Sequence, residues 1–325
     1  MPYRIDLHTD LQVSTELPFL PNGFFFNTPE HVRQQRVGGG HTVLAVNSLT
    51  NQAEARCTFF VDGDQARSPA AAPFGSVEFV ETLPESVLDD FLDALAAAVA
   101  ATGVSIFRLV NYPHCYAPQQ AQRLTEQLIK SGFTIVSANQ NFFLPITSTA
   151  FETIIDASER RRLQKCRNAG FRFAHWEKPD IDAVTAFLVS TRQRQGYALT
   201  LPPDRLRQLL RTFPDQFPVF AVSDGTTIAA LTVAVRVRAD ILYNFLPASS
   251  PDYQAYSPMV LLTDGLVTYC QVQHIQLLDL GVSLDSEQQP KPSLIRFKRN
   301  LGAQESPKLV FEKRFQEEAS NVNNR

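Results

Sequence analysis

Residues 219–237 read VFAVSDGTTIAALTVAVRV, and the architecture of the second half of the chain follows from this stretch. The runs Val219–Ser223 and Thr227–Val237 are rich in apolar and β-branched residues, which favour strands. Asp224-Gly225 lies between them, and Asp-Gly between two such runs is a strong signal for a hairpin turn. The pattern therefore predicts an antiparallel hairpin with Asp224-Gly225 at its tip.

The segments on either side of this hairpin alternate between helical and strand patterns. Three helices are expected before the hairpin, and strand, helix, strand, short helix and last strand are expected after it. The expected helices are 152–169, 181–195, 203–211, 257–271 and 293–300, and the expected strands are 241–245, 275–280 and 308–311.

The first half repeats this order of elements without repeating its residues. A short helix begins at Thr28-Pro29, and a blurred hairpin joins 42–46 to 54–61. The expected strands that follow are 76–80, 105–110 and 133–138, with helices 86–101 and 118–130 between them. A Pro/Ser/Thr-rich break at 145–149 predicts domains 1–147 and 148–315, with a flexible tail at 316–325. The expected class is α/β in the broad sense (α+β).

Composition excludes several functional classes. The 325 residues include 30 basic and 33 acidic side chains, a net charge of −3, which argues against non-specific DNA binding. Hydrophobic residues make up 44% of the chain, enough for two cores, and the four cysteines form no CxxC pair. No export signal or membrane span is visible, so we expect a cytoplasmic protein. Cys270 and His274, four residues apart, have no further ligands nearby, so we expect no metal.

Several segments of the second half carry a resemblance to a known family. They are the basic run Arg160–Gly170, Tyr243-Asn244, the segment Ser250–Pro258, Leu278–Ser283, and Leu294–Lys298 with Gly302-Ala303. Their order is similar to that of the FemAB-like group of the acetyltransferase (GNAT) superfamily. The likeness covers roughly 150–315 in detail and the first half by architecture alone. It implies tandem GNAT-like domains, each with a mixed, mostly antiparallel sheet flanked by helices.

The resemblance also implies an activity. FemAB-like proteins move an acyl or aminoacyl group from acyl-CoA or aminoacyl-tRNA to an amine, on a small molecule or a peptide. Two departures leave the donor open. The pyrophosphate loop of ordinary GNAT enzymes is absent, because Tyr256–Met259 stands in its place, and no heptad stretch forms the long arm that some Fem-type transferases carry. The alternative is a degenerate module that binds an anionic metabolite or a protein partner.

Two regions are candidates for binding the donor. Ser257 and Pro258 are favoured at a helix start, where free N–H groups can hold an anion, and Tyr256 and Met259 flank them. In the basic run, Arg161 and Lys165 are four residues apart and would project together on a helix. The alternatives are an ordinary capped helix and a solvated charged face.

Asp279 is the sharpest catalytic candidate, because a carboxylate interrupts an apolar strand near its C-terminal end. It would act as a base or hold the acceptor's ammonium group, unless it is a structural partner of Arg236 or Lys298 or a cap for the following turn. Tyr243 is a candidate acid on the neighbouring strand, and Lys298 a candidate for neutralising charge. Asn244, Ser283, Asp285 and Phe297 are candidates for binding the substrate. Trp176, the single tryptophan, is expected to be a packing anchor.

Overall fold

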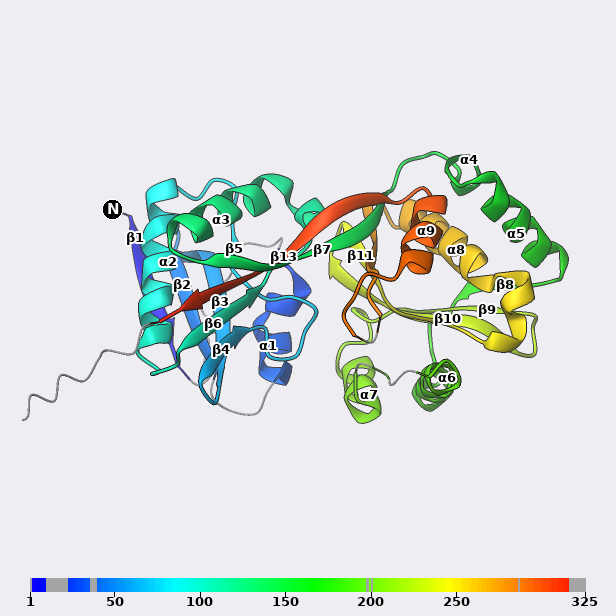
Figure 1. Cartoon of the computed structure of the whole chain (residues 1–325), viewed down its shortest axis with the longest axis horizontal. Helices are drawn as coiled ribbons and strands as arrows, with labels where there is room; N and C mark the ends of the chain where they lie inside the picture. The colour runs from blue at the N-terminus through cyan, green and yellow to red at the C-terminus, as the bar shows by residue number, and fades with distance from the viewer. Residues whose placement is uncertain are drawn as a thin grey trace, which may run out of the picture. The chain divides into compact units, whose positions relative to one another are not determined.

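The computed structural model of the chain describes residues 2–9, 23–35, 40–196, 199, 201–285 and 287–315 (Figure 1). It divides into two compact units, Met1–Asn139 with Pro307–Arg325, and Gln140–Ser306. Each unit has its own buried core. The tail expected at 316–325 lies outside the described residues.

The N-terminal unit is a mixed, mostly antiparallel sheet with helices packed on it. Its strand order is β1-β2-β3-β4-β6-β13, with β5 beside β3, and only β4 and β6 among the paired strands are parallel. Helix α2 packs one apolar stripe, including Leu88, Phe91 and Leu95, into the core. The elements are β1 (Tyr3–His8), α1 (Pro29–Gln35), β2 (Gly40–Asn47), β3 (Gln52–Asp62), β4 (Gln65–Ser68), β5 (Glu78–Phe79), α2 (Glu85–Ala100), β6 (Ile106–Val110), α3 (Pro118–Lys130) and β7 (Thr134–Pro145).

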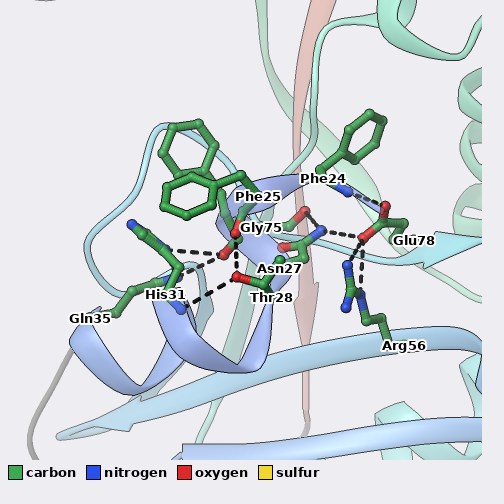
Figure 2. Close-up of polar contacts among 10 residues, drawn as sticks. Phe24, Phe25, Asn27, Thr28, His31, Gln35, Arg56, Gly75 and Glu78 are labelled. Carbon is green, nitrogen blue, oxygen red and sulfur yellow. Dashed lines mark hydrogen bonds and ion pairs between the residues drawn. The ribbon is translucent and has the colours of Figure 1, made fainter. Parts of the chain in front are cut away.

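A buried ion pair in this unit ties the segment before α1 to the sheet. Figure 2 shows Glu78 of β5 between Arg56 of β3 and the segment that contains Phe24 and Asn27. Arg56 Nη2 lies 2.8 Å from Glu78 Oε2, and the same carboxylate accepts bonds from Phe24 N and Asn27 Nδ2. These bonds satisfy a charge pair that would otherwise be costly to bury.

The C-terminal unit has the same kind of sheet. Its strand order is β7-β12-β11-β10-β9-β8, and only β11 and β12 among the paired strands are parallel. The elements are α4 (Phe151–Ile154), α5 (Ala157–Asn168), β8 (Arg172–His175), α6 (Ile181–Arg194), α7 (Pro203–Thr212), β9 (Val219–Ser223), β10 (Ile228–Arg238), β11 (Ile241–Ser249), α8 (Pro258–Val272), β12 (Leu277–Val282), α9 (Pro292–Asn300) and β13 (Gln304–Arg314). The expected pair of mixed, mostly antiparallel sheets with flanking helices is therefore confirmed.

The hairpin at Asp224-Gly225 is also confirmed. Strands β9 and β10 pair antiparallel, and the Asp224 carboxylate accepts bonds from the N–H groups of Thr226 and Thr227. These bonds lower the pKa of Asp224, and Gly225 adopts a φ of 95° that glycine tolerates.

Two expectations differ from the structure. The expected helix 152–169 is broken at Ile155-Asp156, where the Asp156 side chain accepts a bond from Ser158 N and begins α5. The expected boundaries at 147 and 315 also differ from the observed division. Residues 307–314 belong with the N-terminal unit, because this part of β13 pairs with β6, from Val310 opposite Val110 to Arg314 opposite Ile106.

Candidate functional site

The parallel strands β11 and β12 separate at their C-terminal ends. Their pairing covers only Ile241 to Tyr243 against Leu277 to Asp279. Beyond this point β11 continues to Ser249, while β12 stays paired with β7 through Val282. The C-terminal ends of parallel strands are where open α/β sheets place ligands.

Asp279 lies where the pairing stops, and its carboxylate is held in one orientation. Only 2% of the residue is exposed. Its Oδ1 atom accepts hydrogen bonds from Asn141 Nδ2 and from Gly281 N, both at 2.7 Å. These two bonds partner an oxygen that would otherwise be costly to bury.

Lys298 reaches the same point from α9. Its Nζ atom donates to the carbonyl oxygens of Gly281, at 2.8 Å, and Val282, at 2.9 Å, and lies 5.4 Å from the centre of the Phe142 ring. Burial lowers the pKa of Lys298 to about 8, although the negative charge of Asp279 opposes this shift. At neutral pH, about one unit below this pKa, most of the Lys298 side chains therefore still carry their charge.

Tyr243 is the register partner of Asp279 and closes this group of side chains. Its ring lies against Gly281, since a Cβ on that glycine would be 3.1 Å from Tyr243 Cε2. Burial and the charge of Asp279 raise the pKa of Tyr243, so the phenol stays protonated at neutral pH. The structure thus gathers Asp279, Lys298 and Tyr243 around Gly281, and we call these four residues with Asn141 the Gly281 cluster.

Three expected substrate-binding residues have different surroundings. Asn244 is on the opposite face of β11 from Tyr243, where its Oδ1 atom accepts from Thr232 Oγ1 at 2.7 Å. Asp285 organises its own loop by accepting from the N–H groups of Glu287 and Gln289. Ser283 is 3% exposed, and its hydroxyl has no hydrogen-bond partner among the described residues.

A cavity of about 480 Å³ lies at the end of β11, and we call it the β11 cavity. Its wall is mostly apolar and includes the expected residues Ser257, Met259 and Phe297. The complete lining is Arg162, Arg192, Gln195, Pro247, Ala248, Ser249, Gln254, Ser257, Pro258, Met259, Val260, Leu294 and Phe297. Its volume is in the range of small-molecule sites.

Arg192 and Gln195 of this lining were not expected from the sequence. Arg192 donates to the carbonyl of Pro247 and Gln195 to that of Ser249, so both hold the free end of β11. The pattern of α6 shows polar residues on a helix surface and carries no sign that two of them reach a strand end.

The start of α8 differs from the expected capped helix. Ser257 has a φ of 53°, in the left-handed region, and its hydroxyl forms no capping bond. Ser257 thus stands at the expected position before the helix and Pro258 begins it, but the Ser257 hydroxyl does not cap the free N–H groups. Pro258 has no N–H group, and Val260 N donates to Ser257 O. Two of the first three helical residues thus offer no free N–H group to a pyrophosphate.

Two expected donor-binding residues contact each other instead of this cavity. Lys165 donates to the carbonyl of Ala255 at 2.7 Å and lies 5.6 Å from the centre of the Tyr256 ring. The Tyr256 ring in turn packs against Phe171. Arg161 is exposed. The basic residue of α5 that lines the β11 cavity is Arg162, which pairs with buried Glu159 at 2.6 Å.

Parts of this chain are similar to known proteins in sequence and in structure. Residues 157–299 match the acetyltransferase (GNAT) domain family. No curated protein matches the sequence. FemX is similar in structure, with a TM-score of 0.69 and 12% identity over 97% of this chain and 98% of FemX.

Two further solved structures are similar over a smaller part. The C-terminal domain of a putative lysylphosphatidylglycerol synthetase from Agrobacterium fabrum has a TM-score of 0.57 and 13% identity, over 81% of this chain and 82% of that one. L-PGS from Bacillus licheniformis has a TM-score of 0.54 and 14% identity, over the same shares. At these identities the likeness shows the fold.

Two findings from the described part of the chain bear on partners. No helix in it combines the length and the apolar character of a membrane span. No group of three or more His, Cys, Asp or Glu side chains in it is placed to hold a metal ion.

Proposed function

We propose that this protein transfers an acyl or aminoacyl group to an amine, because residues 157–299 form a GNAT domain on a FemX-like fold. One observation carries the proposal: the pairing of β11 and β12 stops at Tyr243 and Asp279, and the β11 cavity opens where β11 continues alone. A donor in this cavity would bring its carbonyl carbon toward the separated strand ends.

The start of α8 favours an aminoacyl ester, such as aminoacyl-tRNA, over acyl-CoA as the donor. The helix end offers few free N–H groups, whereas the acyl-CoA loop of ordinary GNAT enzymes depends on such groups. A similar structure is named as a putative lysylphosphatidylglycerol synthetase, and that name denotes placement of a lysyl group. The experiment described below therefore tests both aminoacyl-tRNA and acyl-CoA.

The Gly281 cluster supplies the chemistry of the proposed step. The acceptor nitrogen attacks the donor carbonyl, a C–N bond forms, and the ester C–O or thioester C–S bond breaks. Asp279 takes the proton from the nitrogen or anchors its ammonium form. Tyr243, protonated at neutral pH, gives a proton to the leaving group, and Lys298 stabilises the negative charge on the carbonyl oxygen.

The experiment offers the purified protein both donors with a panel of amines, including free amino acids and short peptides. Mass spectrometry would detect the N-acylated product, and omission of the amine is the blank. We expect amine-dependent product from aminoacyl-tRNA. Lys298→Gln should reduce product formation strongly, and Arg299→Gln, the next residue on α9, is the matched control. No product from any pairing would contradict the proposal.

A binding module is the second candidate, because the two charged side chains of the Gly281 cluster are nearly sealed. Asp279 is 2% exposed and Lys298 is 6% exposed. A protein that binds a donor in the β11 cavity and forms no product would fit this candidate. Equilibrium binding of the same donors, measured beside the product assay, separates it from the transferase.

A further inference from the structure

A second cavity lies at the other end of α8 from the β11 cavity. It has a volume of about 570 Å³ and is formed by the end of β8, the loop before β9, Arg236 of β10 and the last turn of α8. We call it the Trp176 cavity. The β11 cavity contacts Val260 and the Trp176 cavity contacts Tyr269, so about 14 Å of helix rise separates the two contacts.

Flat aromatic surfaces form one part of its wall. Trp176, His175 and Tyr269 all line it, and the rings of His175 and Tyr269 are 5.3 Å apart. Trp176 is half-buried, so the expectation that it is only a packing anchor does not account for its place on a cavity wall. Such surfaces favour a planar ring in stacked or edge contact.

Arg236 supplies a positive charge to the same cavity. Within the described residues its guanidinium forms no hydrogen bond and no ion pair, although the side chain is half-buried. Its charge lowers the pKa of Cys270 on α8, against the larger effect of burial, so it lies near the C-terminal end of that helix. A helix C-terminus favours a cation beside it. The described residues therefore supply no acceptor for the five N–H donors of its planar head.

The remaining charged side chains of the lining are at exposed positions. Lys178 opposes Glu177 and Asp215, and with Arg236 the lining has two positive and two negative side chains. None of these four forms an ion pair within the described part of the chain. The half-buried charge is therefore the arginine, and a guanidinium fork matches a carboxylate in two parallel bonds.

We propose that the Trp176 cavity binds a small carboxylate that carries an aromatic ring. The carboxylate pairs with Arg236, and the ring lies against Trp176 and Tyr269. The volume fits such a ligand, since small-molecule sites commonly measure about 300–1,000 Å³. This site is independent of the proposed transferase activity.

The single tryptophan provides a direct test, because all tryptophan fluorescence of this chain comes from the cavity wall. Titration with 3-phenylpropionate should change that fluorescence at millimolar concentration or below. Propionate lacks the ring and 2-phenylethylamine lacks the carboxylate, so each should bind about tenfold more weakly or worse. A free tryptophan derivative titrated in parallel corrects for direct quenching by the probe.

Substitutions then test whether the fluorescence change depends on Arg236. Arg236→Gln should weaken 3-phenylpropionate binding about tenfold or more, with an unchanged melting temperature. Arg238→Gln, on the same strand but outside the lining, should bind as the wild type does. If Arg236→Gln unfolds, the comparison of the three probes on the wild type decides alone. Equal binding of 2-phenylethylamine, no response to 3-phenylpropionate, or undiminished binding by folded Arg236→Gln would overturn the proposal.

Discussion

Gly281 is the residue on which the polar side chains of the candidate site converge. Its N–H group donates to Asp279, its carbonyl accepts from Lys298, and its missing side chain leaves room for the Tyr243 ring. Its φ of 73° is one that glycine adopts readily. One backbone position thus fixes a carboxylate, an ammonium group and a phenol together.

The first prediction concerns Asp279, whose substitution by asparagine keeps the shape of the side chain and removes its charge. If the carboxylate is the base or ammonium anchor, Asp279→Asn should lower the rate about 10²–10⁴-fold with the fold intact. If it only holds the strand end together, the cost should be about 1–3 kcal/mol of stability, with the rate of folded protein unchanged.

Turnover and melting temperature measured on the same Asp279→Asn sample distinguish these results. Asp224→Asn, at the exposed hairpin tip, is the control for replacing a carboxylate that accepts backbone bonds. A loss of stability without a loss of rate would remove Asp279 from the mechanism.

The second prediction uses the lowered pKa of Lys298. Below pH 8 this lysine is charged in both states, and the folded protein bears the full cost of burying that charge. Between pH 8 and an unfolded pKa of about 10.4, the unfolded state binds more protons, so the free energy of unfolding rises with pH. The full gain is on the order of 3 kcal/mol, because a tenfold change in a proton-binding constant corresponds to about 1.4 kcal/mol.

Denaturant unfolding followed by Trp176 fluorescence measures this gain, since Trp176 and Lys298 belong to the same unit. The stability of the wild type minus that of Lys298→Gln should increase as the pH rises above 8. The same difference for Arg299→Gln should stay flat. A flat difference for Lys298→Gln as well would mean that Lys298 titrates near its ordinary pKa.

Three members of the Gly281 cluster, Asp279, Tyr243 and Lys298, could be predicted from the sequence, whereas Asn141 could not. Asp279 interrupts an apolar strand, and such an interruption is visible in the sequence. One of the two bonds that hold it comes from Asn141, on a strand 138 residues away in the chain, and no local pattern reveals that pairing. For the same reason Arg162 could not be told from Arg161 before the faces of α5 were known.

At the scale of elements, α8 packs on the sheet closely enough to require a glycine. A Cβ built on Gly265 would lie 2.1 Å from Phe173 Cγ of β8. The third prediction is that Gly265→Ala destabilises the protein by about 1–3 kcal/mol, because the clash outweighs a helix-propensity gain of up to about 1 kcal/mol.

The cause can be isolated in a double-mutant cycle with Phe173→Ala. When the ring is absent, Gly265→Ala should cost nothing or stabilise, so the coupling between the two changes should exceed about 1 kcal/mol. Additive effects measured by urea unfolding would show that the contact with Phe173 is not the reason for glycine at this position.

Most helices and strands could be predicted where the local sequence pattern is strong, and were missed where it is weak. The expected helix 118–130 has the observed bounds, and the Asp-Gly hairpin formed as its turn chemistry requires. Strands β1, β4 and β8 were not expected. Each is only four to six residues long, and each owes its strand pairing to a partner strand. The break at Asp156 was missed because the capping bond competes with a continuous helical pattern.

At the scale of the molecule, two cores are formed by one chain that leaves the N-terminal unit and returns to it. The cluster that contains Phe107 and Phe311 and the cluster that contains Leu278 and Leu262 share no residue. The return could not be foreseen, because the partner of the last strand is set by tertiary pairing and not by its own residues. The two units should therefore differ in their response to core mutations.

The fourth prediction tests this independence with one mutation in each core. Phe311→Ala removes a fully buried ring from the N-terminal unit and should cost about 3–5 kcal/mol there. Circular dichroism should then show an early transition, while Trp176 fluorescence, which reports on the other unit, keeps its midpoint. Leu278→Ala, in the C-terminal core, should instead move the fluorescence midpoint downward.

The alternative to independent unfolding is that both units unfold in one transition, as units joined by a large interface can do. If Phe311→Ala lowers the fluorescence midpoint as much as the dichroism midpoint, the chain unfolds cooperatively as a whole. If the dichroism shows two transitions while the fluorescence midpoint is unchanged, the C-terminal unit keeps its fold after the N-terminal unit has unfolded. In that case the fluorescence response to 3-phenylpropionate should persist between the two transitions, because every residue lining the Trp176 cavity belongs to residues 140–306.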